Sequence, residues 1–193
     1  MPVSINGNGH ISGLAVGGLG ANVVNSTSLH NDAVTSAHMP SNTIVQVVQT
    51  FKNNTDSTSS GSFADISGFT VSITPSATSS KILYSGHLYL GFSGAEGNFR
   101  LTRTVGGTAT EIGNSSVVDD DADGAFAIGG GSQYTPATFS FLDSPNTTSA
   151  TTYKMQWKVE SSHTFYLNRC VWDTDNSGYQ RTVSMIMAQE VSA

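Results

Sequence analysis

Apolar and polar residues alternate along most of the chain from about residue 43 onward. The clearest run is residues 152–159 (TYKMQWKV), in which every second residue is apolar. A period of two with one polar face is typical of an antiparallel strand whose other face is buried. The same reasoning predicts further strands at residues 44–51, 63–73 (bent near Gly68), 81–92, 98–105, 138–142, 163–171 and 181–191.

Polar, glycine-rich segments separate these predicted strands. Residues 53–61 (NNTDSTSSG) are predicted to form a loop, and Gly106 and Gly107 are predicted to form a tight turn. About eight or nine strands joined in this way are typical of a sandwich or barrel. No window has a helical period, and parallel folds need helical crossovers. We therefore expect an all-β fold, an antiparallel β-sandwich of jelly-roll type, at residues 43–193.

Residues 1–42 have a different pattern, in which isolated apolar residues are separated by Gly, Ser and Asn. Asp32 is the only charged residue of this segment. Such a segment buries too little apolar surface to fold alone. We expect an extended arm that pairs with other copies of itself or docks on another protein; a flexible linker is the alternative. The apolar residues expected to make these contacts are Leu14, Val16, Leu19, Leu29, Val34 and Met39.

Composition and charge exclude several classes of protein. Only 11% of the 193 residues are charged, and 8 Lys and Arg face 14 Asp and Glu, for a net charge of −6. A nucleic-acid binder is normally basic, and a membrane-spanning helix needs about 18 consecutive apolar residues, so neither role is expected. Cys170 is the single cysteine, which excludes a disulfide scaffold. The N-terminus lacks the pattern of a secretory signal.

No catalytic motif stands out. The chain has no G-x-S-x-G nucleophile elbow, phosphate-binding loop or dinucleotide-binding glycine motif. Glycan hydrolysis needs paired carboxylates across a sugar bond, whereas the acidic residues here sit mainly in loop runs. We therefore expect a protein that is not an enzyme and that needs no cofactor, apart from the Ca²⁺ considered next.

An acidic run contains the sequence's one metal-site candidate. Asp119, Asp121 and Asp123, followed by Gly124, match the first half of a D-x-D-x-D-G calcium loop. Alternating oxygen ligands and a glycine at the sharp turn suit Ca²⁺ coordination. The glutamate of the twelfth position is missing, because residue 130 is Gly. The alternative is a solvated hairpin loop whose charge discourages edge-to-edge pairing.

Aromatic residues in or near predicted loops are candidates for stacking on sugar rings. Packing in the core or at its rim is the alternative for each of them. These candidate glycan contacts are Tyr134, Tyr166, Trp172 and Tyr179.

Several segments resemble one family. They are residues 63–69 (FADISGF), 139–145 (FSFLDSP), 148–156 (TSATTYKMQ), 181–184 (RTVS) and 187–191 (MAQEV). They resemble the C-terminal domains of tail-fibre and other appendage proteins of tailed bacteriophages, especially marine and cyanobacterial ones. The N-terminal arm is similar to the low-charge segments that link such fibres to the virion.

The resemblance implies a homotrimer on the surface of a virion, at the tail or the capsid. The arm would bind other virion proteins, and the sandwich would face the host and its cell-surface glycans with the avidity of three copies. Synthesis in the host cytoplasm agrees with the lack of disulfides. Phage fibres are typically much longer, so a tail fibre, a head fibre and a capsid decoration protein stay open. A Ca²⁺-dependent carbohydrate-binding module is a further alternative.

Overall fold

The computed structural model describes residues 4–5, 11–12, 34, 38–94, 96–113, 124–128, 134–159, 163–174 and 177–193. The chain divides into two compact units, Met1–Met39 and Pro40–Ala193. In the first unit, β1 (Ser4–Ile5) pairs antiparallel with β2 (Ile11–Ser12). Of the apolar arm residues, Val34 and Met39 are exposed. Leu14, Val16, Leu19 and Leu29 lie outside the described residues.

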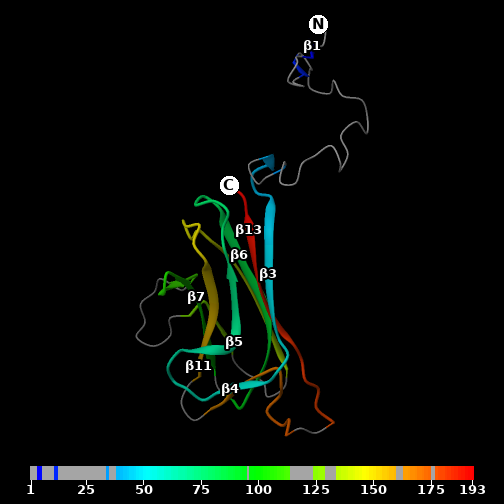
Figure 1. The fold of residues 1–193 in the computed structure, drawn as a ribbon. Helices are drawn as coiled ribbons and strands as arrows, with labels where there is room; N and C mark the ends of the chain where they lie inside the picture. The colour runs from blue at the N-terminus through cyan, green and yellow to red at the C-terminus, as the bar shows by residue number, and fades with distance from the viewer. Residues whose placement is uncertain are drawn as a thin grey trace. The chain divides into compact units, whose positions relative to one another are not determined.

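The second unit is built of strands, and the expected all-β antiparallel sandwich is confirmed (Figure 1). The jelly-roll type stays a prediction. The strands are β3 (Ile44–Lys52), β4 (Asp56–Thr58), β5 (Ala64–Ile73), β6 (Lys81–Phe92), β7 (Gly97–Val105), β8 (Thr108–Ile112), β9 (Phe126–Ile128), β10 (Thr135–Asp143), β11 (Thr151–Val159), β12 (Phe165–Leu167) and β13 (Ser184–Val191).

The strands form two sheets with antiparallel pairing throughout. The first sheet has the order β3-β13-β6-β12-β4, and β10 also pairs with β6. The long strand β6 is its centre: β13 pairs with Lys81–His87, β12 pairs with Leu90–Phe92, and β10 pairs along residues 82–90. The second sheet has the order β5-β11-β7-β8, and β9 also pairs with β7.

Glycines confirm two predicted local features. Gly106 and Gly107 both have positive φ, 56° and 85°, and join Val105 to Thr108 in a two-residue hairpin. Positive φ at both central residues is the requirement of a type I′ turn. Gly68 has φ 67°, and the register of β11 against β5 shifts between Lys154 and Gln156. The predicted bend in this strand is therefore a β-bulge.

Short strands were missed or misplaced by the sequence pattern. β4 lies inside residues 53–61, which were expected to form a loop, and only Phe165–Leu167 of the predicted strand 163–171 forms β12. β4 and β12 pair with each other over three residues. β8 and β9 were not predicted at all. Pieces of three to five residues are too short to show a reliable pattern of their own, and they become strands because a neighbouring strand offers free backbone groups.

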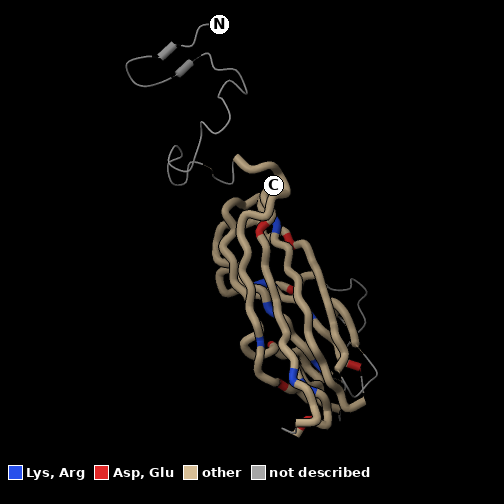
Figure 2. Tube along the Cα trace, turned by 90° about the vertical axis from the view of Figure 1, so that its right-hand side faces the viewer, with Lys and Arg blue, Asp and Glu red and all other residues tan. Residues whose placement is uncertain are grey.

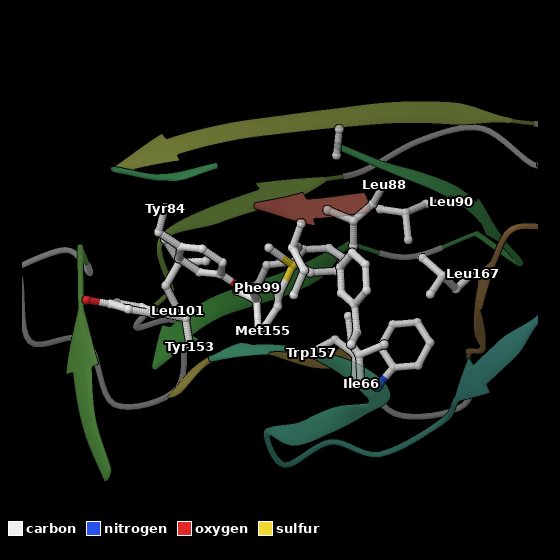
Figure 3. Packing of buried hydrophobic residues seen from close by; sticks show 14 of the residues in the cluster. Ile66, Tyr84, Leu88, Leu90, Phe99, Leu101, Tyr153, Met155, Trp157 and Leu167 are labelled. Atoms are coloured by element: carbon white, nitrogen blue, oxygen red, sulfur yellow. The ribbon is translucent and has the colours of Figure 1, made fainter. Parts of the chain in front are cut away.

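The core lies between the two sheets (Figure 3). The predicted alternation of β11 is confirmed, since Tyr153, Met155, Trp157 and Val159 are all buried. The facing residues of β6 include Tyr84, Leu88 and Leu90. Each large apolar side chain buried here contributes about 1.5 to 3 kcal/mol relative to exposure.

Buried polar side chains connect the two sheets. The Asp143 carboxylate, at the end of β10, accepts a hydrogen bond from the Arg103 guanidinium at 2.8 Å and one from the Tyr153 hydroxyl at 2.7 Å. Burial raises the pKa of Tyr153, and Asp143 raises it further while Arg103 opposes both. The phenol therefore stays protonated and donates to Asp143. A second hydrogen bond between the sheets is made by the Lys52 ammonium of β3, which donates to the Ser67 carbonyl of β5 at 2.7 Å.

Residues 40–43 are fixed beside the end of β13. The Asn42 N–H donates to the Ser192 carbonyl at 2.8 Å, and the Ser192 N–H donates to the Thr43 carbonyl at 2.9 Å. The Ser192 hydroxyl donates to the Pro40 carbonyl at 3.1 Å. The sandwich therefore has its entry, before β3, and its exit, after β13, at one end, called the arm end below.

Candidate functional site

The sandwich has two different ends. β3 and β13 are antiparallel, so Ile44 and Val191 lie at the arm end, whereas Lys52 and Ser184 lie at the other. We call this second end the loop end, because residues 168–183 connect β12 to β13 there (Figure 1). A strand of 9 residues such as β3 is about 30 Å long, which separates the two ends.

All four candidate aromatic residues lie at the loop end. Tyr166 belongs to β12 and pairs with Gly91 of β6, and Tyr134 directly precedes β10, whose first residue pairs with Leu90. Trp172 and Tyr179 lie in the connection from β12 to β13 and are 46% and 39% exposed. The structure thus brings together residues that are up to 45 positions apart in the sequence.

Two of these aromatic residues are engaged within the molecule. The Tyr134 hydroxyl donates to the Gln180 carbonyl. Burial raises the pKa of Tyr134, and Cys170 and Asp173 add to the rise, so the phenol stays protonated. The Arg169 guanidinium lies 4.4 Å from the centre of the Tyr166 ring, a cation–π contact. Trp172 and Tyr179 therefore supply the rings with the most exposed surface.

An ion pair fixes the same connection. The Arg181 Nε lies 2.9 Å from the Asp173 Oδ2, and Asp173 is buried. Cys170, three residues before Asp173, is also buried and is a free thiol. The connection so fixed carries the exposed rings of Trp172 and Tyr179, and exposed aromatic faces suit stacking on planar or sugar-like surfaces.

Asn168 anchors this connection to the sheet, and the sequence analysis did not single it out. Its backbone is left-handed, with φ 61°, and its side chain is fully buried. The amide Nδ2 donates to the carbonyls of Lys52 at 2.7 Å and Asn54 at 3.0 Å. Its Oδ1 accepts from the Ser184 hydroxyl at 2.6 Å. A single amide therefore joins the β3–β4 and β12–β13 junctions.

The predicted calcium ligands Asp119, Asp121 and Asp123 lie outside the described residues. Within the part of the chain that the structure describes, no group of three or more His, Cys, Asp or Glu is placed to hold a metal ion. The calcium site stays a prediction.

A cavity of about 230 Å³ opens between β10 and the β8–β9 side of the second sheet. Its described lining has no titratable side chain, so it offers no group for acid–base chemistry. The lining residues are Leu101, Gly113, Ala125, Phe126, Thr138, Phe139, Ser140 and Phe141.

The outer face of the second sheet carries charged pairs. Asp65 accepts hydrogen bonds from the Lys154 ammonium at 2.7 Å and from the Gln156 amide at 2.7 Å. Partial burial alone would raise the pKa of Asp65, but these two donors and the Lys154 charge outweigh it, and the pKa is lowered.

We expect Asp65→Asn to lower the free energy of unfolding at pH 7 by a few tenths of a kcal/mol, because the pair is largely exposed and screened. A lowered pKa contributes stability above the ordinary value of 3.8, and this contribution is lost as the pH falls below it. Urea unfolding of both proteins at pH 7 and pH 3 should show a difference at pH 7 that shrinks at pH 3. A difference of equal size at both pH values would contradict this account.

Comparisons with known proteins give distant similarity only. No family model matches the chain, and no curated protein matches it. Among solved structures, that of infectious bursal disease virus, Gx strain, has 13% identity and a TM-score of 0.36, and the match covers 78% of this chain. The VP2 subviral particle of infectious bursal disease virus has 11% identity and a TM-score of 0.33 over 77% of this chain.

The chain spans 39% and 37% of the lengths of these two proteins. Similarity at this level supports no conclusion about function. Among the described residues, no helix has the length and apolar character needed to cross a membrane.

Proposed function

We propose that this protein is a structural component of a virion, a trimeric appendage of tail-fibre type. Its N-terminal arm attaches to the particle, and its β-sandwich presents the loop end to the host surface. The observation that carries the proposal is the polarity of the sandwich. The chain enters at the arm end, beside Ser192, whereas Trp172 and Tyr179 are exposed at the opposite end.

The composition of the arm supports the attachment role. Its apolar residues stand singly among Gly, Ser and Asn, and it has almost no charge. A segment of this kind gains buried surface by pairing with other copies or by docking on a partner. The resemblance to arms that link phage fibres to the virion agrees with this role.

Trimerisation supports the receptor-facing role. Exposed aromatic rings bind a sugar weakly at a single site. Three copies held together bind a surface of repeated sugars with much higher avidity, without any new contact.

Two measurements on the full chain test this proposal. Size-exclusion chromatography with light scattering should give a mass of about three times 20.2 kDa, and a monomer would contradict the trimer. Immunogold labelling of the particle should place the protein on a tail appendage. Labelling on the head instead would overturn the tail-fibre assignment in favour of the capsid decoration protein.

Trp172→Ala tests the receptor-facing end. We expect binding of the full-length protein to an array of bacterial surface polysaccharides to fall about tenfold or more, because the loss at each site is multiplied by avidity. Val183→Ser is the matched control, since Val183 is also exposed, at 42%, and lies near the same end but has no ring. Equal binding by Trp172→Ala and the native protein would contradict a glycan role for this end.

A further inference from the structure

The outer face of the first sheet is a broad surface that the two-layer sandwich leaves uncovered. In β13 the residues at alternate positions from Ser184 are buried, so the others point outward, and the register carries this assignment to the neighbouring strands. The outward residues of β3, β13, β6 and β10 form what we call the outer face: Ile44, Val47, Gln49, Phe51, Lys81, Leu83, Ser85, His87, Tyr89, Pro136, Thr138, Ser140, Leu142, Met185, Met187, Gln189 and Val191.

This outer face is apolar and almost without charge. Phe51, Val47, Ile44 and Leu142 are 57%, 53%, 49% and 49% exposed. These four strands turn no Asp, Glu or Arg outward, and their single outward Lys, Lys81, lies at the arm end. Where β12 continues the sheet at the loop end, the Arg169 guanidinium lies against the Tyr166 ring. Figure 2 turns the side with β3 and β13 towards the viewer, and its strands are mostly tan. Of the acidic residues that the structure describes, Asp143 and Glu190 belong to these strands, and both are buried rather than turned outward.

The outer face of the second sheet is the internal comparison. It carries Lys154 paired with Asp65, at 2.7 Å, and Arg100 paired with Glu111. Lys158 lies over the Phe63 ring on the same sheet. Both faces belong to one domain with one overall composition, so low charge in the chain does not explain why only one face lacks it. The outer face of the second sheet therefore carries the charged pairs typical of a solvated surface, and the outward residues of these four strands of the first sheet do not.

We infer that the outer face of the first sheet is the surface through which copies of this chain pack against each other. This inference rests on the proposed trimer and assigns its contact surface. Around the threefold axis of a trimer the same residues of the three copies come near one another, so acidic residues on this face would repel, and a face without them avoids that repulsion.

The size and shape of the face agree with this occupant. Four strands about 4.8 Å apart and about 30 Å long give a flat area on the order of 500 Å² before side-chain relief. Two such faces together reach the about 1,000 Å² of total buried area that a specific interface needs. Met185 and Met187 lie at its centre and have the flexible side chains that adapt to a facing surface. β3 is also a long edge strand with exposed apolar residues, which a neighbouring copy would protect from uncontrolled pairing.

The test adds charge at two half-exposed positions of the full chain, Val47→Lys and Leu142→Lys, singly and together. Ala109→Lys is the matched control, because Ala109 is exposed on the edge strand β8 of the second sheet. We expect native protein and Ala109→Lys to have the same oligomeric mass by light scattering. The double variant should dissociate to about 20.2 kDa, and each single variant should need at least tenfold more protein to assemble.

Each outcome decides one point. Far-UV circular dichroism confirms that the strands are kept, and if the double variant unfolds, the single variants carry the test. An oligomer that all three lysine variants leave intact overturns this inference and leaves the proposed trimer standing. In that case, faster cleavage of residues 1–39 by protease in the variants would show that the arm covers the face. A native protein that is monomeric overturns both the inference and the proposed trimer.

Discussion

Replacing Asn168 with Ala is expected to lower the free energy of unfolding by about 3 to 5 kcal/mol. The change removes the amide that donates to the Lys52 and Asn54 carbonyls and the oxygen that accepts from Ser184. Leaving buried polar groups without partners costs about 1 to 3 kcal/mol each. Ala at φ 61° adds about 1 to 2 kcal/mol of backbone strain.

A matched control separates the backbone from the amide. Asn146 also has a left-handed backbone, with φ 53°, but its side chain is exposed. Asn146→Ala should therefore cost only the backbone part, about 1 to 2 kcal/mol. Urea unfolding followed by tryptophan fluorescence measures both variants. Equal losses for the two would show that the buried amide contributes nothing beyond its conformation.

Replacing Gly97 with Ala is expected to be as damaging as removing the Phe165 side chain, about 3 to 5 kcal/mol. A Cβ atom at Gly97 would lie 1.2 Å from the Phe165 ring, so the ring must leave its site. Phe165 comes from the first sheet and packs against Phe92 and Phe99, with ring centres 5.2 and 5.9 Å away. Its displacement opens the core between the sheets.

The double variant gives the sharper test. If Gly97→Ala acts only by expelling the ring, Gly97→Ala combined with Phe165→Ala should cost little more than Phe165→Ala alone. Gly61→Ala is the control, because its nearest neighbour is the Val159 oxygen at 3.9 Å, and it should change stability by less than about 0.5 kcal/mol. Additive losses in the double variant would refute the steric explanation. Thermal melting of the native protein and the four variants provides the comparison.

The sequence predicted the long strands because their own residues alternate. β3, β6, β7 and β11 lie within a residue or so of their predicted limits, and the hairpin at Gly106 and Gly107 follows from turn chemistry alone. β4 and β8 were missed because most of their residues are polar, and β9 because three residues are too few to show a pattern; each forms a strand only through pairing with a neighbour.

The candidate site was predictable in its residue types but not in its placement. The loop segments pointed to Tyr134, Tyr166, Trp172 and Tyr179, but only the pairing of β6 with β10 and β12 shows that they share one end. Asn168 was overlooked because an asparagine in a loop is ordinary, and its burial depends on partners more than 100 positions away. The uncharged outer face was also hidden, because it joins strands that are distant in sequence.

The junction of residues 40–43 with Ser192 has a consequence for evolution. A domain whose first and last residues lie side by side can be replaced by recombination, because the replacement domain has to fit the rest of the protein at that one end only. A different sandwich domain could then be joined to the same arm and would bring different loops at the loop end. If the proposed function holds, such an exchange would change the surface recognised by the loop end while the attachment arm is inherited unaltered.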